Sequence, residues 1–126
     1  MKKANKGGRH EFRIKRVYDE PSADDGMRFL VDRLWPRGIK KEALAKVEWL
    51  KEVAPSSELR IWFGHEPAKW SEFQKRYRAE LIKNSVACKP LLDAIKKDDV
   101  TLLFGAKDPA INHAVVLKSY LVSKSR

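Results

Sequence analysis

A run of five residues, Val100-Thr101-Leu102-Leu103-Phe104, constrains the fold of this chain more than any other feature of its sequence. The run has the length of a strand, and its apolar side chains do not alternate with charged ones. Strands of this kind are buried on both faces, as in parallel sheets that carry a packed layer on each side. The run therefore predicts a strand inside the sheet of a layered α/β fold.

Further strands and helices are predicted on either side of this run. Residues 12–18 and 27–32 have strand character, and a polar loop rich in turn residues separates them. The order of elements is two strands, several helices, one strand and one helix. This order predicts a small single-domain α/β fold in which helices flank a short, largely parallel sheet. Helices are predicted over residues 40–53, 57–63, 67–83, 90–95 and 109–122.

Local signals mark the ends of several of these helices. Ser56 suits the N-cap of the helix that ends at Phe63, and Gly64 suits the position after its last turn. Asp108-Pro109 predicts the start of the last helix, with Asp at the N-cap and Pro at the first helical position. Apolar residues at three- and four-residue steps are expected to face the core: Leu44, Val47 and Leu50, then Trp70, Phe73, Tyr77 and Leu81, and finally Ala114, Val115, Leu117 and Leu121.

The size and composition of the chain exclude several classes of protein. Its 126 residues, 43% of them hydrophobic, agree with one domain that buries a core. No apolar segment approaches the roughly 18–20 residues of a membrane span, and the N-terminus lacks the apolar region of a signal peptide. The single cysteine, Cys88, has no partner for an internal disulfide, and a buried inert thiol is expected. We therefore expect a soluble protein of the reducing cytoplasm.

The net charge of +10 is concentrated near the N-terminus. Residues 1–16 hold seven basic side chains and one acidic one, so they contribute more than half of the excess. Residues 1–10 are predicted to form a mobile basic arm, and residues 11–126 the α/β domain. The arm either contacts the phosphates of a nucleic acid or serves only to keep the protein in solution.

Two predicted strands lead directly into loops that carry basic side chains. One strand leads into Arg33 and Arg37, and the apolar run leads into Lys107. In open α/β sheets, ligands bind beyond the carboxyl ends of the strands. If the two strands are parallel neighbours, both loops leave the same edge of the sheet, and the three basic side chains converge near a helix N-terminus. This arrangement predicts an anion site for phosphate or carboxylate.

Each of these basic residues also has an ordinary structural explanation. Arg33 and Arg37 can instead form ion pairs, and Lys107 can be an exposed loop lysine. The carboxylates that would serve in such pairs are Asp19, Asp32 and Glu80.

Four more residues complete the candidate site. His113 is the candidate general acid or base, because a helix N-terminus favours its neutral form, although a lone histidine on an apolar helix face is also typical of a packing residue. Asn112 and His65 are expected to orient the ligand, although His65 can instead close a turn. Trp35 either plugs the core together with Pro36 or offers an aromatic platform to a base or a sugar.

Other chemistries find little support in the sequence. No histidines or carboxylates have the spacing of metal ligands, so neither a metal nor a cofactor is expected. Gly105-Ala106-Lys107 lacks the pattern of a phosphate-binding P-loop, and no Gly-x-Ser-x-Gly nucleophile elbow occurs. The sequence therefore leaves open whether the protein is an enzyme.

Several motifs occur together in this chain, the most specific being Arg33-Leu34-Trp35-Pro36-Arg37-Gly38. The others are Val17-Tyr18-Asp19, Leu59–His65, Arg76–Leu81, Thr101–Phe104 and Asn112–Ala114. Together they span roughly residues 12–122 and resemble the YeaO-like group within a bacterial and archaeal family, domain of unknown function 488. The resemblance implies a small soluble α/β protein and supplies no established reaction. The chain departs from the family pattern at Phe104, where a Tyr is common, and at Glu66, where an Asp is more usual.

Two functions agree with these features. The first is a cytoplasmic protein whose pocket of Arg, Lys and His side chains holds a phosphate-bearing ligand, with or without catalysis. That ligand is a nucleotide, a phosphorylated metabolite or the end of a nucleic acid. The alternative is a non-catalytic nucleic-acid-binding protein that uses the basic arm and a basic helix face, formed by Lys69, Lys75, Arg76 and Lys83.

Overall fold

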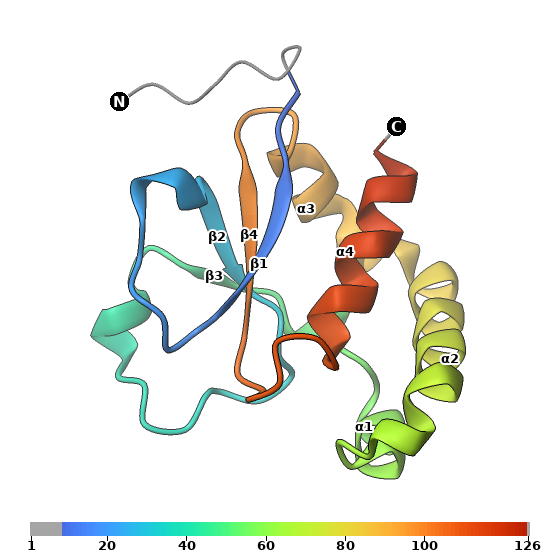
Figure 1. The fold of residues 1–126 in the computed structure, drawn as a ribbon. Coiled ribbons are helices and arrows are strands. Elements are labelled where there is room, and N and C mark those ends of the chain that lie inside the picture. The colour runs from blue at the N-terminus through green and yellow to red at the C-terminus, as the bar shows by residue number, and fades with distance from the viewer. Residues whose placement is uncertain (1–8, 126) are drawn as a thin grey trace.

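The sheet consists of parallel strands, and the strand predicted from the apolar run lies inside it. This strand, β4 (Val100–Phe104), lies between β1 (Phe12–Arg16) and β2 (Met27–Leu30). The short β3 (Glu48–Trp49) pairs with the other edge of β2, which gives the order β1-β4-β2-β3. The computed structural model describes residues 9–125, and Figure 1 shows its helices α1 to α4 gathered on one side of this sheet. The prediction of a small α/β fold with a parallel sheet is confirmed.

All five residues of β4 are buried, because chain segments cover both faces of the sheet. Successive side chains of a strand point to opposite faces. Leu102 accordingly belongs to a large core cluster on the helical side, whereas Leu103 belongs to a smaller cluster on the opposite face. Apolar contacts on both faces are the physical reason why this strand lacks an alternating pattern.

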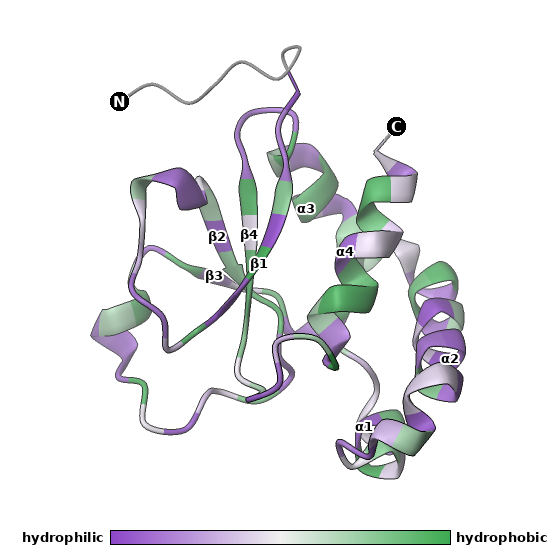
Figure 2. Ribbon diagram, viewed as in Figure 1, coloured by the Kyte–Doolittle hydropathy of each residue, from purple (hydrophilic) through white to green (hydrophobic). Residues whose placement is uncertain are grey.

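The helical layer is formed by α1 (Ser57–Phe63), α2 (Trp70–Lys83), α3 (Lys89–Ala94) and α4 (His113–Lys124). Figure 2 shows β4 and much of α4 as hydrophobic, whereas hydrophilic and hydrophobic residues interchange along α2. This difference agrees with α4 packing against the sheet and α2 packing outside it, with one face toward solvent. Short 3-10 helices occur at Ala23–Asp25, Lys41–Leu44, Lys51–Val53, Pro67–Lys69 and Ser85–Cys88.

The helix predicted over residues 40–53 is wrong. This segment forms a 3-10 turn, the strand β3 and a second 3-10 turn. Leu44 and Val47 share one side, as their spacing predicts, but they pack on the second face of the sheet. The backbone N–H of Leu50 donates to the carbonyl of Leu30 at 2.9 Å. The Leu50 N–H is therefore bonded to the sheet and is not available to a helix. Over so short a segment, the spacing of the apolar residues agrees with either structure.

The predicted start of the last helix is also wrong. Asp108 Oδ1 accepts hydrogen bonds from the backbone N–H groups of Ala110 and Ile111, at 2.8 and 3.1 Å, and these bonds close a turn. The helix α4 begins at His113, and Asn112 is its N-cap. Asp favours both arrangements because its carboxylate makes the same local bonds in a turn and at a cap. Within α4, Val115 is only half-buried, whereas Ala114, Val116, Leu117, Tyr120 and Leu121 are buried.

The boundaries predicted for α1 are confirmed. Ser56 Oγ accepts a hydrogen bond from the N–H of Leu59 at 3.1 Å, and Gly64 ends the helix with a left-handed φ of 53°. Glu80 fixes this cap from α2, because its two carboxylate oxygens accept bonds from the N–H and the hydroxyl of Ser56 at 2.8 and 2.6 Å. The predicted stripe of α2 is buried at Phe73, Tyr77 and Leu81, with Trp70 partly buried against the core.

The start of the described chain is joined to the turn before β4. The His10 ring donates to the carbonyl of Ile95 at 2.8 Å, and the N–H of Glu11 donates to Asp99 at 2.8 Å. The predicted basic arm falls mostly on residues 1–8, which lie outside the described residues, so it stays a prediction. Within residues 9–125, no helix has both the length and the apolar character that crossing a bilayer requires.

An ion pair between a partly buried lysine and a buried carboxylate lies on the second face of the sheet. Lys15 Nζ is 2.8 Å from Asp25 Oδ1, and the N–H of Ser22 donates to the other carboxylate oxygen at 2.9 Å. Burial raises the pKa of Asp25, but the hydrogen bonds from Lys15 and Ser22 and the positive charges of Lys15 and Arg28 together outweigh burial and hold this pKa below its ordinary value of 3.8. A carboxylate whose pKa is lowered by folding stabilises the protein above its unfolded-state pKa, and the contribution is lost as pH falls through the folded-state pKa.

Replacing Lys15 with methionine is expected to lower the free energy of unfolding by about 1–2 kcal/mol at pH 7, since a charge-assisted bond to a mostly buried carboxylate is lost. Without Lys15 the pKa of Asp25 in the folded state rises toward or above its unfolded-state value, so the variant loses less stability than the wild type as pH falls, and the difference between the two proteins shrinks at low pH. Urea unfolding between pH 7 and pH 3 measures both effects. K41M, at an exposed lysine, is the control, and parallel pH profiles for K15M and the wild type would contradict the assignment.

Candidate functional site

The carboxyl ends of β2 and β4 lie side by side at one edge of the sheet. The two strands are parallel, with Leu30 opposite Leu103. A cavity of about 840 Å³, here called the edge cavity, lies where the chain leaves these strands. Its volume is within the range of roughly 300–1,000 Å³ that is usual for small-molecule sites. Its wall comes from residues 32–37, from 54–65 around α1, from 105–113 before α4, and from Tyr18 and Phe73.

The structure brings all the residues proposed from the sequence to the wall of the edge cavity. These are Arg33, Trp35, Arg37, His65, Lys107, Asn112 and His113. The parallel pairing of β2 with β4 brings the segments that hold Arg33 to Arg37 and Lys107 to His113 to one edge of the sheet, whereas His65 comes from the turn after α1. Their individual contacts, however, differ greatly.

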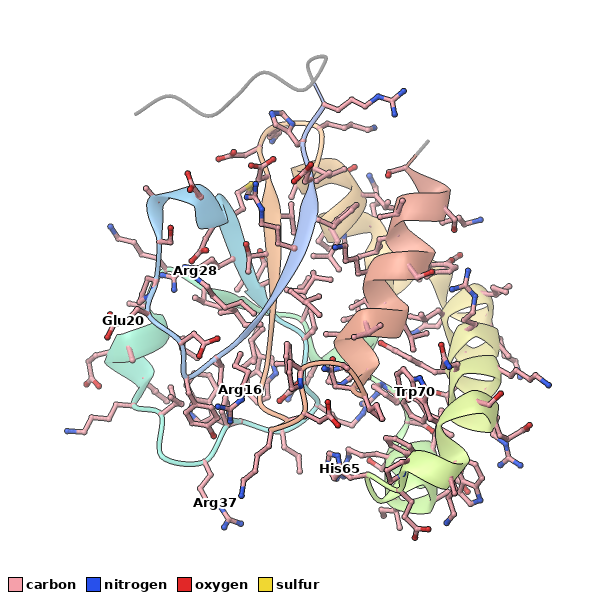
Figure 3. All side chains as sticks on the ribbon, viewed as in Figure 1. Arg16, Glu20, Arg28, Arg37, His65 and Trp70 are labelled. Carbon is pink, nitrogen blue, oxygen red and sulfur yellow. The ribbon has the colours of Figure 1, made fainter. Side chains whose placement is uncertain are left out.

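Arg37 and Lys107 are exposed at the mouth of the edge cavity. The Tyr18 hydroxyl donates to the backbone carbonyl of Arg37 at 2.8 Å and so fixes the backbone from which this side chain extends. Figure 3 shows the Arg37 side chain pointing away from the ribbon, at the same end of the molecule as His65. A third exposed cation, Arg60 of α1, lines the same cavity. The cationic groups of these three side chains form no hydrogen bond or ion pair with any residue that the structure describes.

The Arg33 side chain, unlike the exposed cations at the mouth, is hydrogen-bonded to the backbone of the protein. Its guanidinium donates to the carbonyls of Pro55 and Ala54, at 3.0 and 3.2 Å, and so holds the segment before α1 against the end of β2. The alternative pairing with a carboxylate is not observed, since Glu80 binds Ser56 instead. Two of the five guanidinium N–H groups are thus bonded to the backbone, and Arg33 forms part of the scaffold of the cavity.

Asp32 and His113 form a pair at the inner wall of the edge cavity. The Nε2 atom of His113 lies 3.0 Å from the Val31 carbonyl oxygen and 3.3 Å from Asp32 Oδ1. The other oxygen of Asp32, Oδ2, accepts a hydrogen bond from the N–H of Gly105 at 2.9 Å. Asp32 Oδ1 is buried and has no hydrogen bond, so His113 Nε2 is its polar neighbour.

This geometry fixes the tautomer of His113. A carbonyl oxygen and a carboxylate oxygen are both acceptors, so the proton of the neutral ring must be on Nε2. Nδ1 then remains as an acceptor in the neutral ring and becomes a donor in the charged ring. A His with one nitrogen held by the protein and the other able to exchange a proton has the arrangement of an acid–base or ligand-binding group.

Trp35 and Asn112 have structural contacts that explain their positions. Trp35 Nε1 donates to the carbonyl of Ile39 at 2.7 Å, and the ring packs edge-on against Trp49 with centroids 5.3 Å apart. Asn112 is buried, accepts a bond from the N–H of Val115 at 3.3 Å and donates to the carbonyl of Asp108 at 2.8 Å. Their side chains therefore shape the cavity through these internal bonds.

His65 closes the turn after α1. It has a left-handed φ of 59° and follows Gly64, which also has a positive φ. Its side chain is exposed, and its ring lies 6.1 Å from that of Phe63. The turn therefore presents the imidazole at the mouth of the edge cavity, so both interpretations of His65 agree with its position.

Sequence reasoning missed Tyr18, Asp32 and Arg60 as cavity residues. Asp32 carried the clearest signal, because it directly follows a predicted strand and precedes Arg33. Arg60 lies four residues before Gly64, and its place on the wall depends on how α1 packs beside the sheet. That packing has no local signal in the sequence.

Cys88 and Tyr77 lie in the core and are not part of the wall of the edge cavity. Burial raises the pKa of the Cys88 thiol to about 11, so the thiol is protonated at neutral pH. Burial also raises the pKa of Tyr77, whose hydroxyl donates to the Val53 carbonyl at 2.6 Å. Among residues 9–125, no three His, Cys, Asp or Glu side chains are grouped as a metal site.

Comparison with known proteins places the chain in a family. A family model described as the inactive DUF488-N3 subclade matches residues 11–126. Uncharacterized protein YeaO of Escherichia coli is 50% identical over 109 residues, which cover 86% of this chain and 95% of that protein. Uncharacterized protein Rv3073c of Mycobacterium tuberculosis is 42% identical over 109 residues, covering 86% of this chain and 92% of that protein. No solved structure matches the chain significantly. The chain therefore belongs to the YeaO-like DUF488 family.

Proposed function

We propose that the edge cavity binds a phosphate-bearing ligand and that the protein acts through this binding. One observation carries the proposal. Arg37, Arg60 and Lys107 come from three separate segments, and all three have cationic groups without a partner among the described residues at one ligand-sized cavity. Exposed basic groups that converge on a concave surface attract anions and form charge-assisted hydrogen bonds with phosphate oxygens.

The position of the cavity in the fold supports an anion as the ligand. The wall includes Asn112 and His113, the N-cap and first residue of α4, and a helix N-terminus carries a partial positive charge. The four basic residues of the wall, Arg33 included, outnumber its two carboxylates, Asp32 and Asp108. The local charge is therefore positive even without the basic arm.

Binding without turnover is the form of the proposal that the family favours. The matching family model is described as an inactive subclade. The only cysteine of the chain is buried, with a thiol that is protonated at neutral pH. In a binding protein, His113 contacts the ligand through Nδ1 and transfers no proton. Its role as a general acid or base stays a prediction, to be tested by a search for turnover once a ligand is known.

The test is a thermal-shift screen of the full chain with inorganic phosphate, nucleotides, sugar phosphates and short oligonucleotides. A ligand at one hundred times its Kd adds about 2.7 kcal/mol, which raises Tm by several degrees in a domain of this size. Stabilisation by a small phosphorylated compound, retained in a variant that begins at residue 11, is the expected result. No stabilisation by any compound of the panel would overturn the proposal.

Replacing Arg37 or Lys107 with alanine is expected to weaken binding of that compound by roughly tenfold or more, because each charge-assisted bond contributes about 1.5–3 kcal/mol. Titration calorimetry measures the change in Kd. K97A is the matched control for K107A, since Lys97 is also exposed and lies before the opposite end of β4. Unchanged affinity in both cavity variants would show that the cations are not used.

A nucleic-acid-binding surface on α2 is the second candidate. Lys69 Nζ and the Arg76 guanidinium lie over the Trp62 ring, 5.1 and 4.4 Å from its centroid. Both cations are partly neutralised, because Lys69 is 3.7 Å from Glu66 and Arg76 is 3.0 Å from Glu72. The pairing of Lys69 and Arg76, two of the four basic residues of this face, favours the edge cavity over it. Oligonucleotide affinity that falls steeply with salt and is lost with residues 1–10 would support the alternative instead.

A further inference from the structure

The edge cavity has an apolar part beside its cations. Leu34 and Ile61 line its wall, and their side chains remain 60% and 72% exposed. They come from different segments, the loop after β2 and the last turn of α1. Tyr18, which is 43% exposed, lines the same cavity. Single exposed apolar residues are common on protein surfaces, but three on the wall of one ligand-sized cavity offer apolar contacts to a ligand.

Tyr18 is held in place by one contact with the face of its ring and another with its hydroxyl. The Arg16 guanidinium lies 4.8 Å from the centroid of its ring, and its hydroxyl donates to the Arg37 carbonyl. Arg16 is itself fixed, since its Nε donates to the Ala106 carbonyl at 2.9 Å. An immobilised aromatic ring next to basic side chains is the arrangement on which nucleic-acid bases stack.

We infer that the ligand of the edge cavity is a nucleoside 5′-phosphate, either as a free nucleotide or as the end of a strand. The phosphate lies among Arg37, Arg60 and Lys107, and the base covers the apolar surface formed by Tyr18, Leu34 and Ile61. This inference rests on the proposed function. It goes further because a sugar phosphate or inorganic phosphate satisfies the cations but leaves the apolar surface in water, whereas a base removes that surface from water.

The experiment compares adenosine 5′-monophosphate, ribose 5-phosphate and inorganic phosphate by titration calorimetry on the full chain. The nucleotide is expected to bind at least tenfold more tightly than ribose 5-phosphate, with which it shares the phosphate and the sugar. A 5′-phosphorylated trinucleotide distinguishes the two sources of this group. Tighter binding of the trinucleotide assigns a strand end, and equal or weaker binding assigns the free nucleotide.

A double variant, Leu34→Ser with Ile61→Ser, tests the apolar contact. It is expected to lower nucleotide affinity to within about threefold of ribose 5-phosphate and to leave ribose 5-phosphate affinity unchanged. Both side chains are mostly exposed, so folding is retained, and circular dichroism verifies this. The matched control is Ile82→Ser with Val86→Ser, because these side chains are 64% and 74% exposed but lie outside the edge cavity.

The results separate the inference from the proposed function. If ribose 5-phosphate binds as tightly as the nucleotide and the double variant changes neither Kd, the inference is overturned and the phosphate site stands. If none of the four compounds binds, both the inference and the proposed function are overturned. If the control variant lowers the affinity for the nucleotide as much as L34S/I61S does, the base does not lie on the assigned surface.

Discussion

Replacing Gly26 with alanine is expected to lower the free energy of unfolding by about 4 kcal/mol, which is a large part of the roughly 5–15 kcal/mol usual for a domain. Gly26 has φ 66° and ψ −135°, a conformation that costs other residues about 1–3 kcal/mol. A Cβ at this position would lie 2.2 Å from the carbonyl oxygen of Asp99. That contact is with backbone, so the strands themselves must move, which adds about 1–3 kcal/mol.

The displaced carbonyl also sets the register of the sheet. The N–H of Met27 donates to the Asp99 carbonyl at 2.8 Å, directly before the pairing of Met27 with Val100. A shift at this end of β2 and β4 is carried to their other ends, where the edge cavity lies. G26A is therefore expected to weaken ligand binding as well as stability.

Gly38→Ala is the matched control for this prediction. Gly38 also has a positive φ, 78°, but a Cβ there meets no atom within 4 Å. The G38A variant is expected to lose only about 1–2 kcal/mol of unfolding free energy, the cost of holding an alanine in a left-handed conformation. Urea unfolding followed by circular dichroism compares the two variants. Equal losses in G26A and G38A would mean that the contact with Asp99 relaxes freely.

Replacing Asp32 with alanine is expected to lower the free energy of unfolding by about 3 kcal/mol. The carboxylate joins three segments, since it follows β2, accepts the N–H of Gly105 after β4, and lies 3.3 Å from His113 of α4. Hydrogen bonds to charged groups contribute about 1.5–3 kcal/mol, and the variant leaves the Gly105 N–H without its acceptor. The loss is expected to loosen the inner wall of the edge cavity.

Asp32→Asn separates the two contacts of this side chain. Its amide oxygen still accepts from Gly105, but the charge beside His113 is gone, so an intermediate loss is expected. A double-mutant cycle of D32N with His113→Gln is expected to give a coupling energy of at least about 0.5 kcal/mol. A coupling of zero would contradict the pair. Asp93→Ala, at an exposed pair with Lys89, is the control and is expected to leave stability nearly unchanged, because exposed ion pairs are screened by solvent.

The central part of the fold could be predicted because local and tertiary preferences agree there. An apolar run without alternation is compatible with few positions other than an inner strand, and β4 occupies one. The cap at Ser56 and the left-handed Gly64 likewise have local causes, so α1 was predicted with its ends. The segment before it has no such signal. Trp49 pairs its backbone with β2 and its indole with the Asp32 carbonyl at 2.7 Å, and both contacts are distant in sequence.

The candidate site was predicted in its location but only partly in its contacts. Parallel pairing of β2 with β4 was enough to bring Arg37 and Lys107 together. The hydrogen bonds of Arg33 to Ala54 and Pro55 depend on where a segment about twenty residues away crosses the sheet edge, which no motif encodes. Asn112 lines the edge cavity, and its side chain also caps α4, a contact that the sequence did not predict because the preceding turn moves the helix start to the residue after it.

The order β1-β4-β2-β3 has a consequence for how the protein is made. β1 and β2 do not pair with each other, because each pairs with β4, which is synthesised last. At about 5–20 residues per second, the first two strands wait several seconds on the ribosome for their shared partner. During that time β2 has only its two-residue pairing with β3 available, and β1 has no partner strand. The nascent chain therefore exposes unpaired strand edges and apolar side chains until residue 104 emerges, and this interval is when it is most open to chaperones and to aggregation.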